Sequence, residues 1–576
     1  MSKVARERRM TGRIRRAPRQ NSTPRILARI LLLSTLFAAL PACSLFGGEE
    51  EANPKKPLAK PSQAVEAEGP GECAASLDIL EKIAHGYFPD RSGDILAIEA
   101  LPHQFGTRHS TPYPYTQDVP LMFYGPGYIK PGTYDADATV ADMAPTMAEL
   151  MNFEEFPERD GRVLEEALKP ADERTTPPRL IFTLVWDGGG DNLLGQWPDS
   201  WPNLKKLMEG SAVFENATVG SSPSITPAIH ATIGTGSFPS THGLADIKIR
   251  VKNKIVDAWE GASPRFLEVP TLGDLWDVST GNQALVGAMA RDTWHLGMIG
   301  HGTLFEGGDQ DIAAMDQLGG IDFRTSKRFF SLPDYLLDRT GLEEAVQSFD
   351  QSDGSADGEW IGGPLNALDA QVRFTPAWPP FQSQKLIQLL QEEGYGQDEV
   401  TDLFYTNYKG TDLAGHEWNL IDEEVNEVLI AQDDEIPVVI EALNELVGKG
   451  NYVLTFTADH GMTPYPHVND GWSINTAELS DDIEGSFNPD GEDKPLILSQ
   501  RGYQIMLNRG RAAKLDVSWK EIARFIADYR IEDNVTDESR ELFEDRFADR
   551  AEEHLYLTAL TPQQLRDEIE CAEAAA

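Results

Sequence analysis

The sequence predicts an α/β fold with a mainly parallel central sheet flanked by helices. Two apolar runs of strand length, 179–186 and 451–458, have the character of strands buried on both faces of a parallel sheet, and 402–408 predicts a third strand. Acidic residues and a loop follow each run, and apolar residues recur with the period of a helix over 424–447. Because the carboxyl ends of parallel strands form the binding site in open α/β sheets, these acidic residues are the first candidates for function.

Length and composition favour one large domain with an insertion. The chain has 576 residues, of which 40% are hydrophobic, so it can bury a substantial core. Between 305 and 395 the alternation of strand and loop gives way to Gly, Asp, Trp and Pro, and we expect this part to be a cap inserted over the site. The core would then include 178–304 and 396–576. A formal net charge of −43 excludes a nucleic-acid-binding surface, since a phosphate backbone needs a basic footprint.

The N-terminus has the features of an export signal. Residues 1–29 carry ten Lys and Arg against one Glu, and an apolar run of signal-peptide length follows over 30–42. The run ends in Leu-Pro-Ala-Cys, which resembles a bacterial lipobox. We therefore expect 1–43 to be a lipoprotein signal peptide whose lipidated Cys43 anchors the protein to a bacterial membrane, on its periplasmic or cell-surface side. The alternative is a plain secretory signal that is cleaved nearby. Residues 44–72 are rich in Pro, Gly and charge and predict a flexible linker.

Asp and His residues gather behind the three predicted strands. Asp187 follows the first strand, Asp412 and His416 follow the second, and Asp459 and His460 follow the third. Carboxylate and imidazole groups are ligands that zinc prefers, and two metal ions about 4 Å apart suit in-line displacement at phosphorus. This set predicts a metal centre, and it is still short of a nucleophile and of one more imidazole for two ions.

Thr226 is the candidate nucleophile. It precedes Pro227, a favoured first residue of a helix, and a helix-compatible run follows. Its hydroxyl would lie at a helix N-terminus, where the dipole and the free N–H groups favour an alkoxide and a bound phosphate. The alternative is an ordinary threonine N-cap.

Four segments resemble the metal and nucleophile motifs of the alkaline phosphatase superfamily: VWDGGGDNLL, SITPAIHATIGTGSFPSTHGL, TDLAGH and FTADHGM. The resemblance is to the type I phosphodiesterase/nucleotide pyrophosphatase branch and its threonine-nucleophile phosphatase relatives. It implies an alkaline-phosphatase-like core with two Zn²⁺ ions. One ion would be held by Asp187, Thr226, Asp459 and His460. The other would be held by Asp412, His416 and one further histidine.

The segment GTRHSTPYPYTQDVPLMFYGPG supplies that histidine as His109, with His467 as the alternative. It resembles the metal segment that follows the DHG motif in the superfamily, but here it comes before the nucleophile. This order predicts that residues 73–170 are a displaced part of the core and that the chain is circularly permuted. Permutation needs neighbouring termini. We therefore expect a Cys73–Cys571 disulfide at the junction, the alternative being two free thiols.

The predicted function is hydrolysis of a small phosphate ester, as a phosphodiesterase or phosphomonoesterase, through a covalent phosphothreonine. The relatives' Lys-x-Arg substrate motif is reduced here to ARDT, which leaves Arg291 as the candidate substrate-binding residue. Two alternatives remain open. One is a catalytically silent lipoprotein that keeps the fold as a binding surface, and the other is a hydrolase of phosphonate or sulfate esters. The sequence leaves the oligomeric state undetermined.

Overall fold

The computed structural model describes residues 73–575, except for 175, 317–321, 353, 362, 366–369 and 492–493. All described residues belong to one unit. The predicted signal peptide, Cys43 and the linker lie outside the described residues. Within the described part, no helix is both long enough and apolar enough to cross a bilayer.

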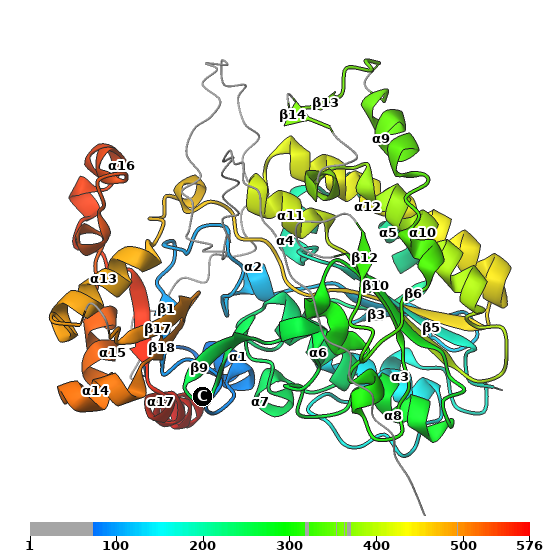
Figure 1. Ribbon diagram of the computed structural model, residues 1–576, viewed down its shortest axis with the longest axis horizontal. Helices are drawn as coiled ribbons and strands as arrows, with labels where there is room; N and C mark the ends of the chain where they lie inside the picture. The colour runs from blue at the N-terminus through cyan, green and yellow to red at the C-terminus, as the bar shows by residue number, and fades with distance from the viewer. Residues whose placement is uncertain are drawn as a thin grey trace, which may run out of the picture. The chain divides into compact units, whose positions relative to one another are not determined.

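The three predicted strands are confirmed and lie side by side at the centre of the larger sheet. They are β5 (Leu180–Trp186), β15 (Asp402–Tyr408) and β16 (Tyr452–Ala458). β5 lies in the middle and pairs in parallel with both neighbours, so that Trp186 is level with Tyr408 and Ala458. Every residue of the three strands is buried. The parallel pairing brings their carboxyl ends to one edge of the sheet, as Figure 1 shows.

Helices cover both faces of this sheet, which confirms the α/β fold (Figure 1). Alternate residues of β5 face opposite cores: Ile181 and Val185 belong to one buried cluster, and Phe182 and Leu184 to the other. The first cluster takes in residues of α3 (Met143–Leu150), α6 (Thr226–Thr235) and α8 (Leu272–Ser279). The second takes in residues of α5 (Pro202–Met208), α10 (Trp378–Glu393) and α12 (Glu423–Leu443).

The predicted cap range, 305–395, begins inside the sheet. β10 (Val286–Ala290) pairs in parallel with β15 on one side and with β11 (Ile312–Asp316) on the other, and β12 (Phe323–Arg324) closes that edge. α10 also belongs to a layer that covers the sheet. The sequence predicted no strand there, because β11 is only five residues long and lies among Gly and Asp residues. That the rest of the range acts as a cap stays a prediction.

The segment 73–170 contributes to both sheets. Its strand β2 (Leu121–Tyr124) inserts between β16 and β6 (Ser211–Phe214), antiparallel to both, and β3 (Gly132–Tyr134) then lies at the sheet's edge. β2 thus pairs with β16, a strand that follows it by more than 300 residues in the chain. In strand order the central sheet runs β12-β11-β10-β15-β5-β16-β2-β6-β3.

The two ends of the described chain meet in a second, antiparallel sheet. β1 (Ile95–Glu99) pairs with β18 (Gln504–Leu507) and β19 (Tyr556–Leu560), and β17 (Ile497–Arg501) completes the sheet. The helices α1 (Leu77–Gly86) and α17 (Pro562–Ala575) are in contact. Beside them the expected disulfide joins Cys73 to Cys571, with the Cα atoms 5.8 Å apart. Adjacent ends are what a circular permutation requires, and the permutation itself stays a prediction.

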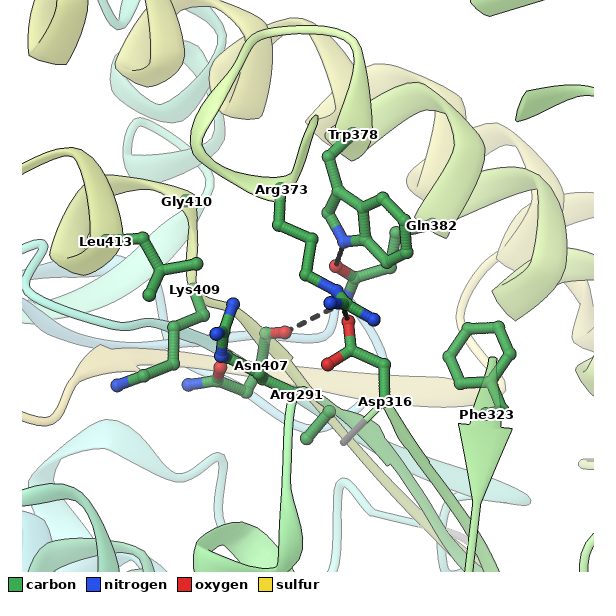
Figure 2. A pocket seen from close by; sticks show the side chains of 11 residues that line it. Arg291, Asp316, Phe323, Arg373, Trp378, Gln382, Asn407, Lys409, Gly410 and Leu413 are labelled. Carbon is green, nitrogen blue, oxygen red and sulfur yellow. Dashed lines mark hydrogen bonds and ion pairs between the residues drawn. The ribbon is translucent and has the colours of Figure 1, made fainter. Parts of the chain in front are cut away.

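A pocket opens at the carboxyl edge of the central sheet, where β10 and β15 end (Figure 2). Arg291 follows β10, Asp316 is the last residue of β11, and Lys409 follows β15, and all three line the pocket. Trp378 and Gln382 of α10 line it from the opposite side.

Candidate active site

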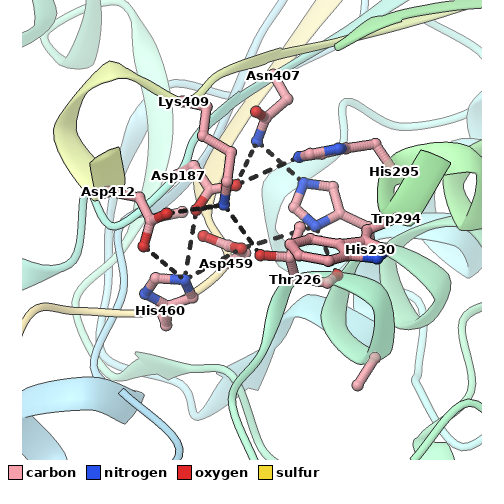
Figure 3. Close-up of polar contacts among 12 residues, drawn as sticks. Asp187, Thr226, His230, Trp294, His295, Asn407, Lys409, Asp412, Asp459 and His460 are labelled. Atoms are coloured by element: carbon pink, nitrogen blue, oxygen red, sulfur yellow. Dashed lines mark hydrogen bonds and ion pairs between the residues drawn. The ribbon is translucent and has the colours of Figure 1, made fainter. Parts of the chain in front are cut away.

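The predicted metal ligands converge at this carboxyl edge (Figure 3). Asp187 follows β5 directly, and Asp459 and His460 follow β16 directly. Asp412 and His416 lie on α11 (Gly410–Glu417), which begins two residues after β15. Since their spacing is one helical turn, both side chains lie on the same face of α11.

The segment before the nucleophile does bring its histidine to this edge. His109 Nε2 is 3.4 Å from Asp412 Oδ1, and His416 Nε2 is 3.3 Å from the same oxygen. The other ring nitrogen of His109, Nδ1, is 2.7 Å from the carbonyl oxygen of Ser224 and donates to it. Burial holds the pKa of His109 well below its usual range, so the ring is neutral. With Nδ1 as the donor, Nε2 presents a lone pair beside Asp412, which is how a metal-binding imidazole is oriented.

His460 lies at the centre of the second set of ligands. Its Nε2 atom is 3.4 Å from both Asp187 Oδ1 and Asp459 Oδ2, and 3.7 Å from Asp412 Oδ1. Burial opposes a charge on His460, but Asp459 and the other carboxylates outweigh it and raise its pKa to about 9. Burial and the neighbouring Asp187 raise the pKa of Asp459 to about 7. Both pKa shifts result from the excess of negative carboxylate charge in this buried site.

Thr226 is the first residue of α6, and Ile225 is the N-cap. The expected helix N-terminus is therefore confirmed, and the role of Thr226 as nucleophile stays a prediction. The side chain is 4% exposed, so the hydroxyl lies inside the site and away from bulk water. The free N–H groups of the first turn of α6 favour negative charge beside it.

Lys409 is a member of the site that sequence reasoning missed. Its Nζ atom donates to Asp187 Oδ1 at 2.7 Å and to Thr226 Oγ1 at 3.0 Å, and it lies 2.9 Å from Asp412 Oδ2. Burial opposes its charge, but the surrounding carboxylates outweigh that and raise its pKa, so the ammonium is charged. A single lysine three residues before an aspartate carries no recognisable signal. Only the fold places it between the nucleophile and the ligands.

Two further histidines and an asparagine support Asp187 from inside the protein. Asn407 Nδ2 donates to Asp187 Oδ2 at 3.1 Å and contacts His230 Nε2 at 3.1 Å. His230 Nδ1 lies 2.8 Å from the carbonyl oxygen of Thr226, one turn earlier on α6. His295 Nε2 lies 3.4 Å from Asp187 Oδ2, so this residue also belongs to the site. All four side chains are buried.

The residues fit divalent metal ions. Asp412 Oδ1, Asp459 Oδ2 and His460 Nε2 are buried and have no hydrogen-bond partner among the described residues. Three groups of ligand atoms within coordinating reach lie at this site: His109, Asp412 and His416; Asp187, Asp412 and His460; and Asp187, His230 and His295. Asp459 belongs to none of the groups found among the described residues. Lys409 offsets one of the three carboxylate charges. Imidazole and carboxylate atoms that converge with lone pairs unused are the donor set that zinc takes.

Arg291 and His467 are the remaining residues that the sequence singled out. Arg291 lines the pocket of Figure 2 and is 8% exposed. His467 belongs to none of the metal-ligating groups found among the described residues, and its ring stacks on Tyr465 with centroids 5.4 Å apart. His109, and not His467, therefore lies beside the other predicted ligands.

The chain is similar to known proteins over much of its length. The profile of the type I phosphodiesterase/nucleotide pyrophosphatase family matches residues 181–571. The alkaline phosphatase PafA of Elizabethkingia meningoseptica is 21% identical over 58% of this chain and 69% of its own length. The alkaline phosphatase PhoV of Synechococcus elongatus is 31% identical over 50% of this chain and 60% of its own. A crystal structure of wild-type PafA covers 61% of this chain and 76% of its own, with a TM-score of 0.47 and 19% identity.

The family match spans more than half of the chain and contains Asp187, Thr226, Asp412, His416 and the Asp459-His460 pair. His109 lies before its first residue, in keeping with the unusual order of the segments. The chain therefore belongs to the type I phosphodiesterase/nucleotide pyrophosphatase family of the alkaline phosphatase superfamily.

Proposed function

We propose that the protein is a two-zinc phosphoric ester hydrolase in which Thr226 is the nucleophile. Family membership and the named alkaline phosphatases among its relatives support hydrolysis of phosphate esters. The observation that carries the finer proposal is the convergence of unused ligand atoms around the N-terminus of α6, where Thr226 is the first residue.

Asp187, Asp459, His460 and Thr226 would hold one zinc ion, and Asp412, His416 and His109 would hold the other. When bound, the two ions supply positive charge that stabilises the oxygens entering and leaving phosphorus. Asn407 and His295 hold Asp187 from inside the protein, at 3.1 Å and 3.4 Å from its Oδ2 atom. Such supporting contacts keep a ligand in one orientation.

The hydroxyl oxygen of Thr226 attacks phosphorus, and the bond from phosphorus to the leaving-group oxygen breaks. The product is a phosphothreonine and the free alcohol, which takes up a proton. A water molecule then attacks the phosphothreonine, so that phosphate leaves and the threonine hydroxyl is restored. Lys409 donates a hydrogen bond to Thr226 Oγ1, which orients this oxygen and favours its anionic form. The N–H groups at the start of α6 face the same charge.

The test is turnover of the zinc-loaded protein with 4-nitrophenyl phosphate and with bis(4-nitrophenyl) phosphate. We expect turnover of at least one ester, lost with chelator and restored by zinc, and a covalent phosphoprotein trapped in acid. A protein that binds two zinc ions but hydrolyses neither ester would contradict the proposal and favour the silent binding surface.

We also propose that the enzyme is exported and anchored through Cys43. The Cys73–Cys571 disulfide supports an oxidising compartment, because such bonds persist outside the reducing cytosol. The basic and then apolar N-terminal sequence supports the signal peptide.

A further inference from the structure

Two buried arginines face the pocket of Figure 2 with donor atoms that have no partner. Arg373 is 1% exposed, and its Nε atom donates to Asp316 Oδ2 at 2.6 Å. Its Nη1 and Nη2 atoms have no hydrogen-bond partner among the described residues, and neither has Nη1 of Arg291. Unpaired buried donors are costly, most of all on a charged group. Three of them in one pocket point to a missing acceptor.

The charges in the pocket call for an anionic acceptor. Among the described residues that line the pocket, two guanidinium groups stand against one carboxylate, that of Asp316, whose Oδ1 atom has no hydrogen-bond partner there. Burial raises the pKa of Asp316 to about 8 even with both arginines nearby, which leaves still less negative charge to balance them. An arginine side chain presents a planar fork of N–H groups that matches the oxygens of a carboxylate or a phosphate.

Aromatic neighbours hold the arginines in place. The Arg373 guanidinium lies over the ring of Trp378, 5.0 Å from its centroid, and the Arg291 guanidinium lies 5.9 Å from the ring centroid of Phe374. Trp378 Nε1 in turn donates to Gln382, whose amide donates to the carbonyl oxygen of Asn407. These contacts hold the arginine donors in fixed positions, so the pocket is a preformed binding site.

The pocket adjoins the nucleophile. Asn407 and Lys409 line it, and these same residues contact Asp187 and Thr226. A group bound to the arginines would thus lie just beyond the ligands that face the phosphoryl group. The pocket is small and partly open to solvent, so the group that reaches the arginines must be small.

We propose that this pocket binds a second anionic group of the substrate, so that the enzyme prefers phosphate esters whose alcohol part carries a carboxylate or a further phosphate. The proposal rests on the proposed function, because the first phosphoryl group must be bound at Thr226. Arg373 gives the pocket its selectivity, and it comes from the segment before α10, where no motif of the sequence directs attention.

The experiment compares substrates of equal shape. The pair is carboxyphenyl phosphate and carbamoylphenyl phosphate, each in the meta and para forms, because carboxylate and carboxamide differ mainly in charge. We expect kcat/KM to favour the carboxylate by about tenfold or more in at least one form, the size of one charge-assisted hydrogen bond. Phenylene bisphosphate serves as the arm that carries a second phosphate in place of the carboxylate.

Arg373→Gln should bring this ratio close to one. The control is Arg250→Gln, which also removes a buried arginine, in this case one that lies 2.5 Å from Asp94 and outside the pocket. It should keep the ratio. The inference is overturned if the unaltered protein shows no preference for any acidic ester, or if Arg373→Gln keeps the preference.

A binding arm separates this inference from the proposed function. If no ester is hydrolysed, the proposed function fails, and the pocket is then judged by calorimetry with carboxybenzyl and carbamoylbenzyl phosphonates. Tighter binding of the carboxylate by the unaltered protein, and equal binding of both by Arg373→Gln, would support the inference. Equal binding of both by the unaltered protein would overturn it.

Discussion

Replacing Lys409 with methionine removes a buried ammonium group from the centre of the site and keeps a side chain of similar length. The lysine is 7% exposed and lies 2.7 Å from Asp187, 2.9 Å from Asp412 and 3.0 Å from Thr226. Without metal, the variant buries two carboxylates that have lost their cationic partner. Loss of one member of a buried ion pair costs about 3–5 kcal/mol, and we expect the free energy of unfolding in chelator to fall by that amount.

Zinc affinity should change in the opposite direction. The Lys409 ammonium and a zinc ion would both contact Asp187 and Asp412, and the two positive charges repel one another. Lys409→Met should therefore lower the dissociation constant for zinc by about tenfold or more, which corresponds to about 1.4 kcal/mol. Turnover should nevertheless fall about 10- to 100-fold, because Thr226 loses a charge-assisted hydrogen bond worth about 1.5–3 kcal/mol.

The assays are urea unfolding in chelator, zinc titration against a competing chelator, and kcat/KM with zinc in excess. Lys82→Met is the matched control. Lys82 is also buried and lies 2.8 Å from Asp78, but that carboxylate is exposed, so the expected loss is below about 1 kcal/mol. Zinc binding that is unchanged or weaker in Lys409→Met would refute the reasoning, as would a loss of stability no larger than that of the control.

Four other predictions concern separate parts of the molecule. Thr226→Ala should lower kcat by about a thousandfold or more with zinc still bound, and turnover within about tenfold of the unaltered protein would mean that another group attacks phosphorus. His109→Ala should reduce the zinc content, measured by mass spectrometry, towards one ion per chain and should strongly lower turnover. His467→Ala should change neither the zinc content nor turnover. The reverse pattern would identify His467 as the ligand. Burial raises the pKa of Glu99 from 4.5 to about 8. Between these pH values the folded protein holds a proton that the unfolded chain has released, so the free energy of unfolding falls as the pH rises. Glu99→Gln should remove that fall, at most about 4 kcal/mol, in urea unfolding at pH 5 and pH 9, and parallel pH profiles for the two proteins would count against the shift. Cys43→Ala should release the protein from membranes or block its processing, and unchanged membrane fractionation would contradict lipid anchoring.

The parts of the fold that the sequence could predict are those with a local signal. β5 and β16 are largely apolar runs, because a strand covered on both faces is built mainly from apolar side chains, and β15 has an apolar stretch at its start. The ligands that directly follow β5 and β16 could be found from that pattern alone. His109 needed a resemblance over a longer segment, since nothing near it in the chain marks it as a ligand.

The rest depends on contacts between distant segments. Lys409 and Arg373 acquire their surroundings only when the ends of β15 and β11 are brought together with α6 and α10, and each is a single basic residue in the sequence. The same holds for His295, which contacts Asp187 across 108 positions of the chain. β11 was not predicted for a different reason: it is only five residues long, and Gly and Asp residues surround it.

The disulfide between Cys73 and Cys571 turns the chain between them into a covalent loop, because the two residues are 498 positions apart. Cutting any one peptide bond within this loop therefore leaves a single molecule whose parts stay joined. After limited proteolysis, a nicked enzyme would migrate as one species on a non-reducing gel and separate into two fragments only when a thiol is added. A protease would have to cut such an enzyme twice before any piece could leave.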